Sequence, residues 1–279
     1  MTATLQRPQP GRFAPRRPVL SRSAPNRPLL GSLGIIGLLA LWEIAPRLGA
    51  VPERYFPPVS EVLTTLAQRA TTAPFWEAIG HTLYGWALGL AIALAAAILI
   101  GFALGATPRL RAFTTSTVDF LRPIPSVALI PLAVLMYGTD IRSTLLLVVY
   151  ACFWLIYIQV LYGVADVDPV AEQTARSYGL GRLARIRYVV WPTTLPYLMT
   201  GLRLAAAVGL ILSITAQLII GSPGIGAQIT NAQQGGAVAL VYAWIVATGI
   251  LGVVINIGVR ALERRVLRWH TSVRGEVAV

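Results

Sequence analysis

The chain contains no lysine, one cysteine and two histidines, and only 12% of its 279 residues are charged. A single cysteine, Cys152, excludes an internal disulfide framework and a CxxC motif. The two histidines lie far apart in sequence, and no metal-ligand spacing is present. The phosphate-binding loop GxxxxGK[ST] is absent, and so is a clustered nucleophile or metal set. We therefore expect no cofactor in this chain and no enzymatic activity of its own.

What is abundant is apolar sequence, since 56% of the residues are hydrophobic. So many apolar residues with so few charges indicate an integral membrane protein. The formal net charge is +12, and all 23 basic residues are arginine. Nucleic-acid binding would be one reading of that charge. The arginines, however, cluster between apolar runs, which favours a role in membrane topology over a nucleic-acid partner.

The hydrophobic runs predict an all-α polytopic protein with six transmembrane helices. A span needs about 20 mostly apolar residues. Six runs meet that length, namely 29–48, 80–106, 113–138, 143–165, 197–220 and 237–259. Residues 221–236 are rich in Gly, Pro and Asn and are expected to form the turn between the last two. The domain division is a basic, Pro-rich disordered leader (1–28), a membrane domain (29–260) and a basic tail (261–279).

The arginines divide unequally between the two sides that six spans define. With the N-terminus inside, the inner segments carry 17 arginines and the outer segments carry four. The inner segments are 1–28, 107–112, 166–196 and 260–279. This excess predicts that both termini and the loop 166–196 are cytoplasmic.

The third run contains both charges and prolines. Asp119 and Arg122 are three residues apart, so on a helix they share a face and can form an ion pair, although a role in gating stays open. Prolines at 123, 125 and 131 interrupt the helical hydrogen bonds. In a bilayer such a break is tolerated only where protein or a water-filled cavity satisfies the freed groups. We therefore expect this segment to line a pathway.

The polar loop 166–196 predicts a helical hairpin outside the membrane. Asp168 and Pro169 are typical of a helix start, and Gly179 of a helix end. The pattern predicts one helix over 169–178 and a second over 182–190, ended by Pro192. The second helix would carry Arg182 and Arg185 on one face and Leu183, Ile186 and Val190 on another. Such a hairpin suits docking to a partner, but a plain loop whose arginines anchor topology is an open alternative.

The loop resembles the EAA loop of permease subunits of bacterial ABC importers. That pattern is Glu-Ala-Ala, three residues, Gly, nine residues, Ile, one residue, Leu-Pro. With Gly179 as its glycine, the triplet falls on Gln173, Thr174 and Ala175, and the closing positions on Val189, Trp191 and Pro192. The glycine, the last alanine and the proline match. Glu172 lies one place before the triplet.

Other segments are similar to one branch of these permeases, the nitrate/sulfonate/taurine type. They are "FPPVSEVLTTL" (56–66), "LRPIPSVALIPLAVLMYG" (121–138), "LPYLMTGLRLA" (195–205), "GSPGIGAQI" (221–229) and "RALERRVLRW" (260–269). The resemblance implies a bacterial inner-membrane permease that works with a second permease copy, two ATPase subunits that bind ATP-Mg, and an extracytoplasmic solute-binding protein. It implies a small solute such as nitrate, a sulfonate, taurine or a vitamin precursor.

By this resemblance the ATPase-coupling loop comprises Glu172, Gln173, Thr174, Ala175, Arg176, Gly179, Arg182, Arg185 and Pro192. Its arginines could contact the ATPase or lipid headgroups. The translocation pathway would include Arg122, Pro123, Pro125, Pro131, Ser213, Thr215 and Gln217. The last three are either helix–helix contacts or cargo contacts, and relatives often carry an acid at position 217. The alternative function is a channel or an ion-coupled secondary transporter, against which the charge-free stretch 204–259 argues.

Overall fold

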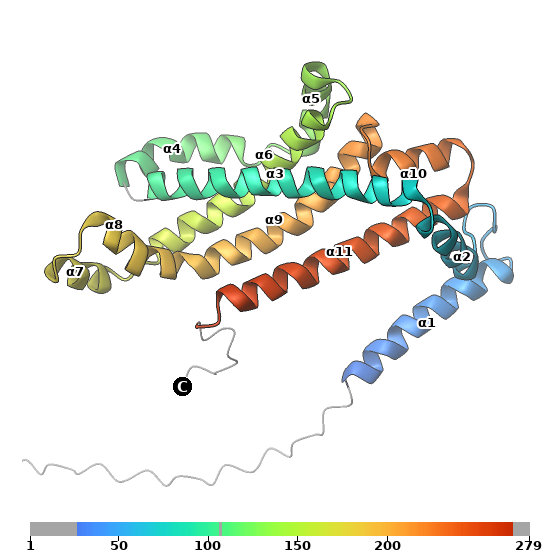
Figure 1. Cartoon of the computed structure of the whole chain (residues 1–279), viewed down its shortest axis with the longest axis horizontal. Coiled ribbons are helices and arrows are strands. Elements are labelled where there is room, and N and C mark those ends of the chain that lie inside the picture. Colours follow the sequence, from blue (N-terminus) through green and yellow to red (C-terminus); the bar gives the residue numbers. More distant parts are fainter. Residues whose placement is uncertain (1–26, 106–107, 270–279) are drawn as a thin grey trace, which may run out of the picture.

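The computed structural model describes residues 27–105 and 108–269, and within these ranges the chain forms helices and no strand (Figure 1). This confirms the all-α fold. The elements are α1 (Arg27–Arg47), α2 (Val59–Ala70), α3 (Ala73–Gly105), α4 (Pro108–Leu121), η1 (Ser126–Leu129), α5 (Ile130–Tyr137), α6 (Ile141–Ala165), α7 (Pro169–Ser177), α8 (Arg182–Arg185), η2 (Ile186–Val190), α9 (Trp191–Ile220), α10 (Ile225–Gln234) and α11 (Val238–Val266). Residues 1–26 of the predicted leader (1–28) and residues 270–279 of the predicted tail (261–279) lie outside the described residues, and the last two leader residues begin α1.

Five helices of the described part are long and apolar enough to cross a membrane: α1, α3, α6, α9 and α11. A sixth span exists if α4 and the η1–α5 segment count as one, and these two parts meet at an angle of 82°. The expected third span is therefore broken rather than straight. The break falls at Pro123 and Pro125, whereas Pro131 lies in the first turn of α5, where its missing N–H costs nothing.

The core lies where α6 packs between α3 and α9. Cys152 and Ile156 of α6 are fully buried there, as are small side chains from α3 and α9. Glycines bring the backbones close together. A Cβ atom at Gly89 would lie 2.7 Å from Val148 Cγ1, and one at Gly101 would lie 2.6 Å from Val160 Cγ1. Close packing of small residues is how helices associate in lipid, where a hydrophobic driving force is missing.

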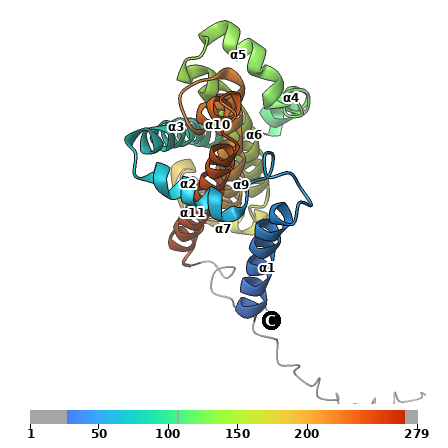
Figure 2. The same cartoon turned by 90° about the vertical axis from the view of Figure 1, so that its right-hand side faces the viewer.

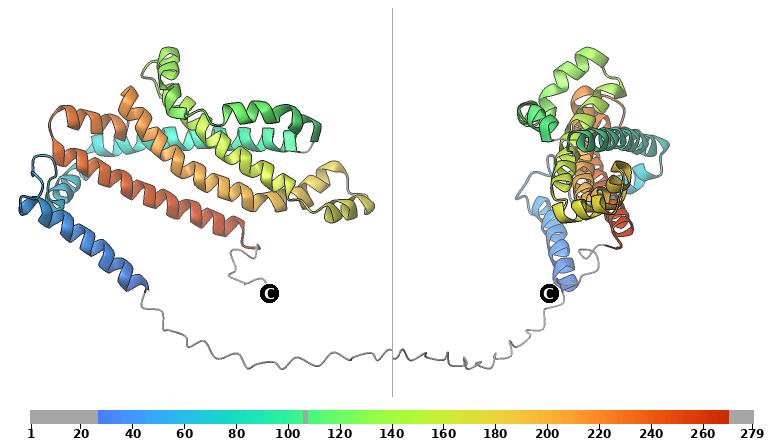
Figure 3. Two further views of the ribbon diagram at one scale, coloured as in Figure 1. Left: turned by 180° about the vertical axis from the view of Figure 1, so that it is seen from behind. Right: turned by 90° about the vertical axis from the view of Figure 1, so that its left-hand side faces the viewer.

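The loops gather at two opposite ends of the bundle (Figures 1 and 3). One end carries the last turn of α3, the α7–α8 hairpin and the last turns of α11, and we call it the arginine-rich end. It holds the four arginines of the hairpin together with Arg260, Arg264 and Arg265. The opposite end carries α2, α10 and the α1–α2 connection, with Arg47, Arg54 and Arg69.

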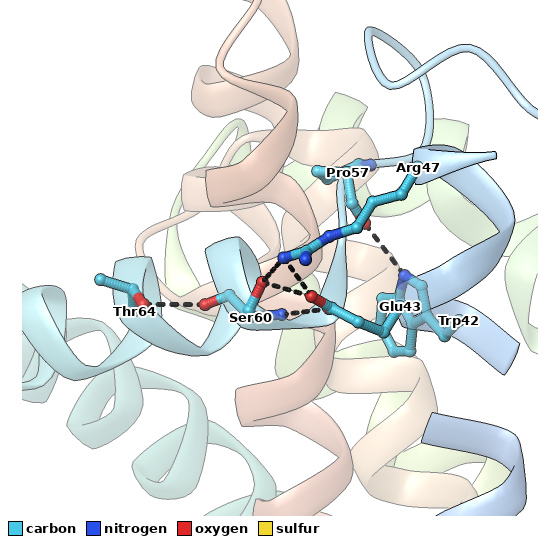
Figure 4. Close-up of polar contacts among 6 residues, drawn as sticks. All are labelled: Trp42, Glu43, Arg47, Pro57, Ser60 and Thr64. Atoms are coloured by element: carbon cyan, nitrogen blue, oxygen red, sulfur yellow. Dashed lines mark hydrogen bonds and ion pairs between the residues drawn. The ribbon is translucent and has the colours of Figure 1, made fainter. Parts of the chain in front are cut away.

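Helix α1 stands apart from the bundle and joins it only near its C-terminal end (Figures 1 and 2). The first turn of α2 follows Pro57 and Pro58 and has no side-chain cap of its own. Glu43 of α1 supplies one, because its carboxylate accepts hydrogen bonds from Ser60 N (2.9 Å) and Ser60 Oγ (2.8 Å) (Figure 4). A carboxylate at a helix N-terminus also interacts favourably with the helix dipole.

Two neighbours complete this joint. Arg47 forms an ion pair with Glu43 and donates to Ser60 Oγ at 3.2 Å, and Trp42 Nε1 donates to Pro57 O at 3.0 Å (Figure 4). The Trp42 ring also packs on Tyr242, which lies near the N-terminal end of α11. Polar and aromatic contacts thus fix the first helix at the end opposite the hairpin.

Two sequence predictions about loops were wrong in detail. Residues 221–236 contain helix α10, and only Gly221–Gly224 before it and Gly235–Gly236 after it are non-helical. The second hairpin helix does not end at Pro192 either, since α8, η2 and α9 follow one another without a break. In η2 the N–H of Trp191 bonds to Ile186 O, an i→i+5 bond. This wider turn leaves room for the proline ring, so the chain stays helical.

Candidate functional site

The hairpin of residues 166–196 projects from the arginine-rich end of the bundle (Figure 1). Its first helix, α7, begins as the sequence predicts. Asp168 Oδ1 accepts a hydrogen bond from Val170 N at 2.8 Å, and Pro169 occupies the first helical position. This cap satisfies one of the N–H groups that a helix start leaves unpaired.

The helix ends in a Schellman motif centred on Gly179. The N–H of Gly179 bonds to Arg176 O at 2.9 Å, and the N–H of Leu180 bonds to Ala175 O at 3.0 Å. Gly179 has a φ of 74°, and a Cβ atom there would meet nothing within 4 Å. The glycine is therefore required by backbone conformation and not by lack of space.

A carboxylate links the two helices of the hairpin. Glu172 Oε1 lies 2.7 Å from Arg176 Nη2 in the same helix and 3.1 Å from Arg185 Nη1 in α8. Arg182 forms no ion pair within the described residues and is exposed. The predicted arginines thus divide into two that fix the hairpin and one that is free for another surface.

The rest of the predicted coupling residues are mostly accessible. Gln173 and Thr174 are exposed, Pro192 is half-buried, and Ala175 is buried against the hairpin. Sequence reasoning missed the apolar part of this surface. Tyr178 is 82% exposed and Leu183 83% exposed, and Val170 and Tyr188 are also exposed. A patch that mixes exposed aromatic and aliphatic side chains with arginines is typical of a protein–protein interface.

The broken span carries the other group of predicted residues. Because Pro125 has no N–H, Leu121 O lacks its ordinary i+4 donor. The hydroxyl of Tyr150 in α6 takes that place and donates to Leu121 O at 2.5 Å. The bend that contains Pro123 is thereby held against α6. The predicted ion pair between Asp119 and Arg122 does not form within the described residues, although Arg122 N bonds to Val118 O at 2.9 Å and so continues the last turn of α4.

Gln217 and Ser213 lie inside the bundle. Gln217 is 2% exposed, and its Oε1 accepts from Thr82 Oγ1 of α3 at 2.9 Å and from Gly226 N of α10 at 3.3 Å. Thr82 in turn accepts from Ile225 N at 2.9 Å. In this conformation Gln217 is therefore a helix–helix contact, as one of the two alternatives had it, while Thr215 is half-buried.

Two glycines let α10 approach α9 closely enough for these bonds. A Cβ atom at Gly224 would lie 2.3 Å from Gln217 Oε1, and one at Gly226 would lie 2.3 Å from Ile214 O. Thr82 could not have been identified from the sequence, because it lies 135 positions from Gln217. Within the described residues no group of three His, Cys, Asp or Glu side chains could hold a metal ion.

Known proteins that this chain resembles in sequence are permease components of transport systems. Residues 89–268 match the family described as binding-protein-dependent transport system inner membrane component. The chain is 30% identical to the taurine transport system permease protein TauC of Escherichia coli, with 88% of this chain and 90% of that protein covered. It is 27% identical to the putative aliphatic sulfonates transport permease protein SsuC of Bacillus subtilis (85% and 86% covered). It is also 27% identical to the bicarbonate transport system permease protein CmpB of Synechococcus elongatus (86% and 90% covered).

Solved structures share the fold at low sequence identity. A bacterial ABC transporter involved in the import of alginate superposes with a TM-score of 0.62 at 15% identity, covering 85% of this chain and 99% of that one. An amino acid ABC transporter superposes with a TM-score of 0.58 at 18% identity, covering 72% and 97%. The helical architecture and the family match together identify the chain as a permease: it belongs to the inner-membrane components of binding-protein-dependent transport systems, the transmembrane subunits of ABC importers.

Proposed function

We propose that the hairpin 166–196 faces the cytosol and docks on a separate ATPase subunit, and that the chain and a second permease copy enclose the pathway of an ATP-driven importer. The ATPase subunits, two per complex, would bind ATP-Mg, and an extracytoplasmic binding protein would deliver the solute. The observation that carries this proposal is the hairpin itself. It is braced by Glu172, carries an exposed mixed surface, and continues directly into α9.

The proposed orientation rests on charge and geometry together. The arginine-rich segments that the sequence predicts to be inside include the hairpin and the end of α11, and these lie at one end of the bundle (Figure 1). Lys and Arg excess marks cytoplasmic loops. Both termini are therefore proposed to be cytoplasmic, in a bacterial inner membrane.

Because α8, η2 and α9 are continuous, a movement of the hairpin would be transmitted to the membrane spans. A displacement of the docked hairpin passes to α9 without crossing a flexible loop. Helix α9 packs against α6 and α3 through the core around Ile156 and Ala205. Closure of an ATPase pair would therefore move these spans as a rigid body and exchange access between the two sides of the membrane.

The solute is proposed to be a small anion. Relatives that cover most of this chain are named for the transport of taurine, aliphatic sulfonates and bicarbonate. All three carry an oxyanion group. This proposal does not choose among them.

Co-purification and transport test the proposal. The permease is co-expressed and purified with the ABC ATPase subunits of its source organism, and Gly179→Trp is compared with Gly80→Trp, an exposed glycine of α3 with open space around it. Gly179→Trp should abolish both retention of the ATPase and ATP-dependent uptake, and Gly80→Trp should preserve them. Uptake at a normal rate without any ATPase would instead support a channel or secondary transporter and contradict the proposal.

A further inference from the structure

A pocket of about 420 Å³ lies between the broken span, α6 and α9. Ligand pockets commonly have about 300–1,000 Å³. Arg122 and Ser126 line it from the bend, Tyr150, Trp154 and Gln159 line it from α6, and Leu204 from α9. The pocket is therefore partly polar, although apolar spans surround it.

The pocket extends from the middle of the membrane-spanning bundle toward the arginine-rich end, and Arg122 lies at its central part, next to Leu121, which bonds to Tyr150. Its lining residues in α6 run from Tyr150 to Tyr162, in a helix that extends from Ile141 to Ala165. Leu204 and Val208 occupy the central part of α9, Trp191–Ile220. Headgroups lie about 15 Å from the centre of a hydrocarbon core that is about 30 Å thick, so lipid phosphates are not natural partners for a group at this depth.

Arg122 is exposed and brings a positive charge to this depth without a counter-ion among the residues that the structure describes. It forms no ion pair within the described residues, and the pocket lining contains no acidic side chain. A charged side chain inside a membrane is costly and typically marks a pathway for an ion or substrate. The lining that the structure describes thus carries a net positive charge.

Polar side chains line the same pocket as Arg122, and the bend that carries Arg122 is held in place. Ser126 and Gln159 place a hydroxyl and an amide group in the lining. The indole N–H of Trp154 is buried and has no acceptor within the described residues, so one donor at this site is unsatisfied. The Tyr150–Leu121 hydrogen bond fixes the backbone immediately before Arg122.

We infer that Arg122 is the residue that binds an anionic solute halfway along the pathway, through charge-assisted hydrogen bonds to a sulfonate or carboxylate group. This inference rests on the proposed function for its cargo, and it assigns the specificity for anions within the membrane to one side chain. A cation in the pathway lowers the energy of a passing anion and raises that of a passing cation.

The local charge can be measured without knowing the cargo. Ser126→Cys is made in a Cys152→Ala background, and the permease–ATPase complex is placed in nanodiscs of zwitterionic phosphatidylcholine, which contain no anionic lipid. The rate of modification by the sulfonate-bearing reagent MTSES is divided by the rate for the neutral reagent MMTS. This ratio is compared for Arg122, Arg122→Lys and Arg122→Gln. Arg142→Gln, at the far end of α6, is the matched loss of one arginine.

We expect Arg122→Gln to lower the ratio about 5- to 10-fold, because a unit charge within several ångströms is only partly screened. Arg122→Lys and Arg142→Gln should leave it within about 2-fold. Dividing by the neutral rate removes changes in access, so a variant that only loosens the bend would not move the ratio. An equal ratio for Arg122 and Arg122→Gln would overturn the inference.

Transport provides the second arm and separates the two proposals. Proteoliposomes with the binding protein and internal ATP are tested for uptake of labelled taurine and bicarbonate. Arg122→Gln should reduce the initial rate at least about 10-fold while the ATPase stays bound, and Arg122→Lys should restore part of it. Normal uptake by Arg122→Gln would overturn the inference. If the unmutated complex imports neither taurine nor bicarbonate, these two solutes are excluded as its cargo, and the reagent ratio still decides whether Arg122 attracts anions.

Discussion

At the scale of single residues, Gly179 and Gln217 are each required for a different reason, the first by backbone conformation and the second by buried hydrogen bonds. Gly179 ends α7 with a left-handed φ in open space, so only backbone energetics are at stake. Gln217 occupies a closed site in which its amide oxygen serves two donors from other helices. The sequence predicts the first role from the position of a glycine after a helical stretch. The second depends on helix packing, which a single sequence does not reveal.

Substitution of Gly179 by alanine should destabilise the hairpin by about 1 kcal/mol, because a Cβ atom disfavours the left-handed region. Asn tolerates this region better, so Gly179→Asn should cost less than Gly179→Ala. Amide hydrogen exchange of residues 169–185 in the membrane-embedded protein measures the difference. Equal protection in the glycine and alanine proteins would show that the Schellman turn does not stabilise the hairpin.

Substitution of Gln217 by leucine should lower the free energy of unfolding by about 1–3 kcal/mol, because the buried N–H of Gly226 loses its acceptor. Gln233→Leu, at an exposed position of α10, is the control and should have little effect. Thermal unfolding of the purified protein in detergent measures both. A Gln217→Leu protein as stable as the control would argue that water or a neighbouring oxygen replaces the amide.

At the scale of elements, the prolines of the third apolar run and the arginine-bearing loop behave in opposite ways. Prolines 123 and 125 interrupt the helix, as the sequence predicted, and the two parts of the span meet at 82°. Pro192 breaks nothing, because the π turn η2 precedes it. The type of turn before a proline depends on the packing of the assembled helices and cannot be deduced from residue order. The same limit explains why α10 was missed within a stretch rich in Gly, Pro and Asn.

The bend should depend on Tyr150. Removing the hydroxyl with Tyr150→Phe leaves Leu121 O without its strongest donor and should cost about 1–2 kcal/mol. Tyr162→Phe is the control, because it removes the same group from a tyrosine that lines the same pocket. The hydroxyl of Tyr162 donates no hydrogen bond to a backbone carbonyl among the described residues. Hydrogen exchange of residues 121–130 should increase for Tyr150→Phe alone. Identical exchange in the two variants would mean that the prolines set the bend without help from α6.

At the scale of the whole molecule, the sequence was most informative. Apolar runs predicted the span count, and the arginine distribution predicted which loops share one end of the bundle (Figure 1). The joint of α1 with α2 through Glu43 and Ser60 could not be predicted, since it unites residues 17 positions apart around a helix start that has no cap of its own. Long-range polar contacts of this kind depend on the assembled fold.

The central claim is that the hairpin 166–196 lies in the cytosol, where an ATPase can bind it. It is tested most directly by labelling Ser177→Cys with a membrane-impermeant maleimide in a Cys152→Ala background. Thr71→Cys, exposed between α2 and α3 at the other end, is the matched site. We predict that Thr71→Cys is labelled in intact spheroplasts and that Ser177→Cys is labelled only in inside-out vesicles. Labelling of Ser177→Cys in intact spheroplasts would place the hairpin outside and contradict the account.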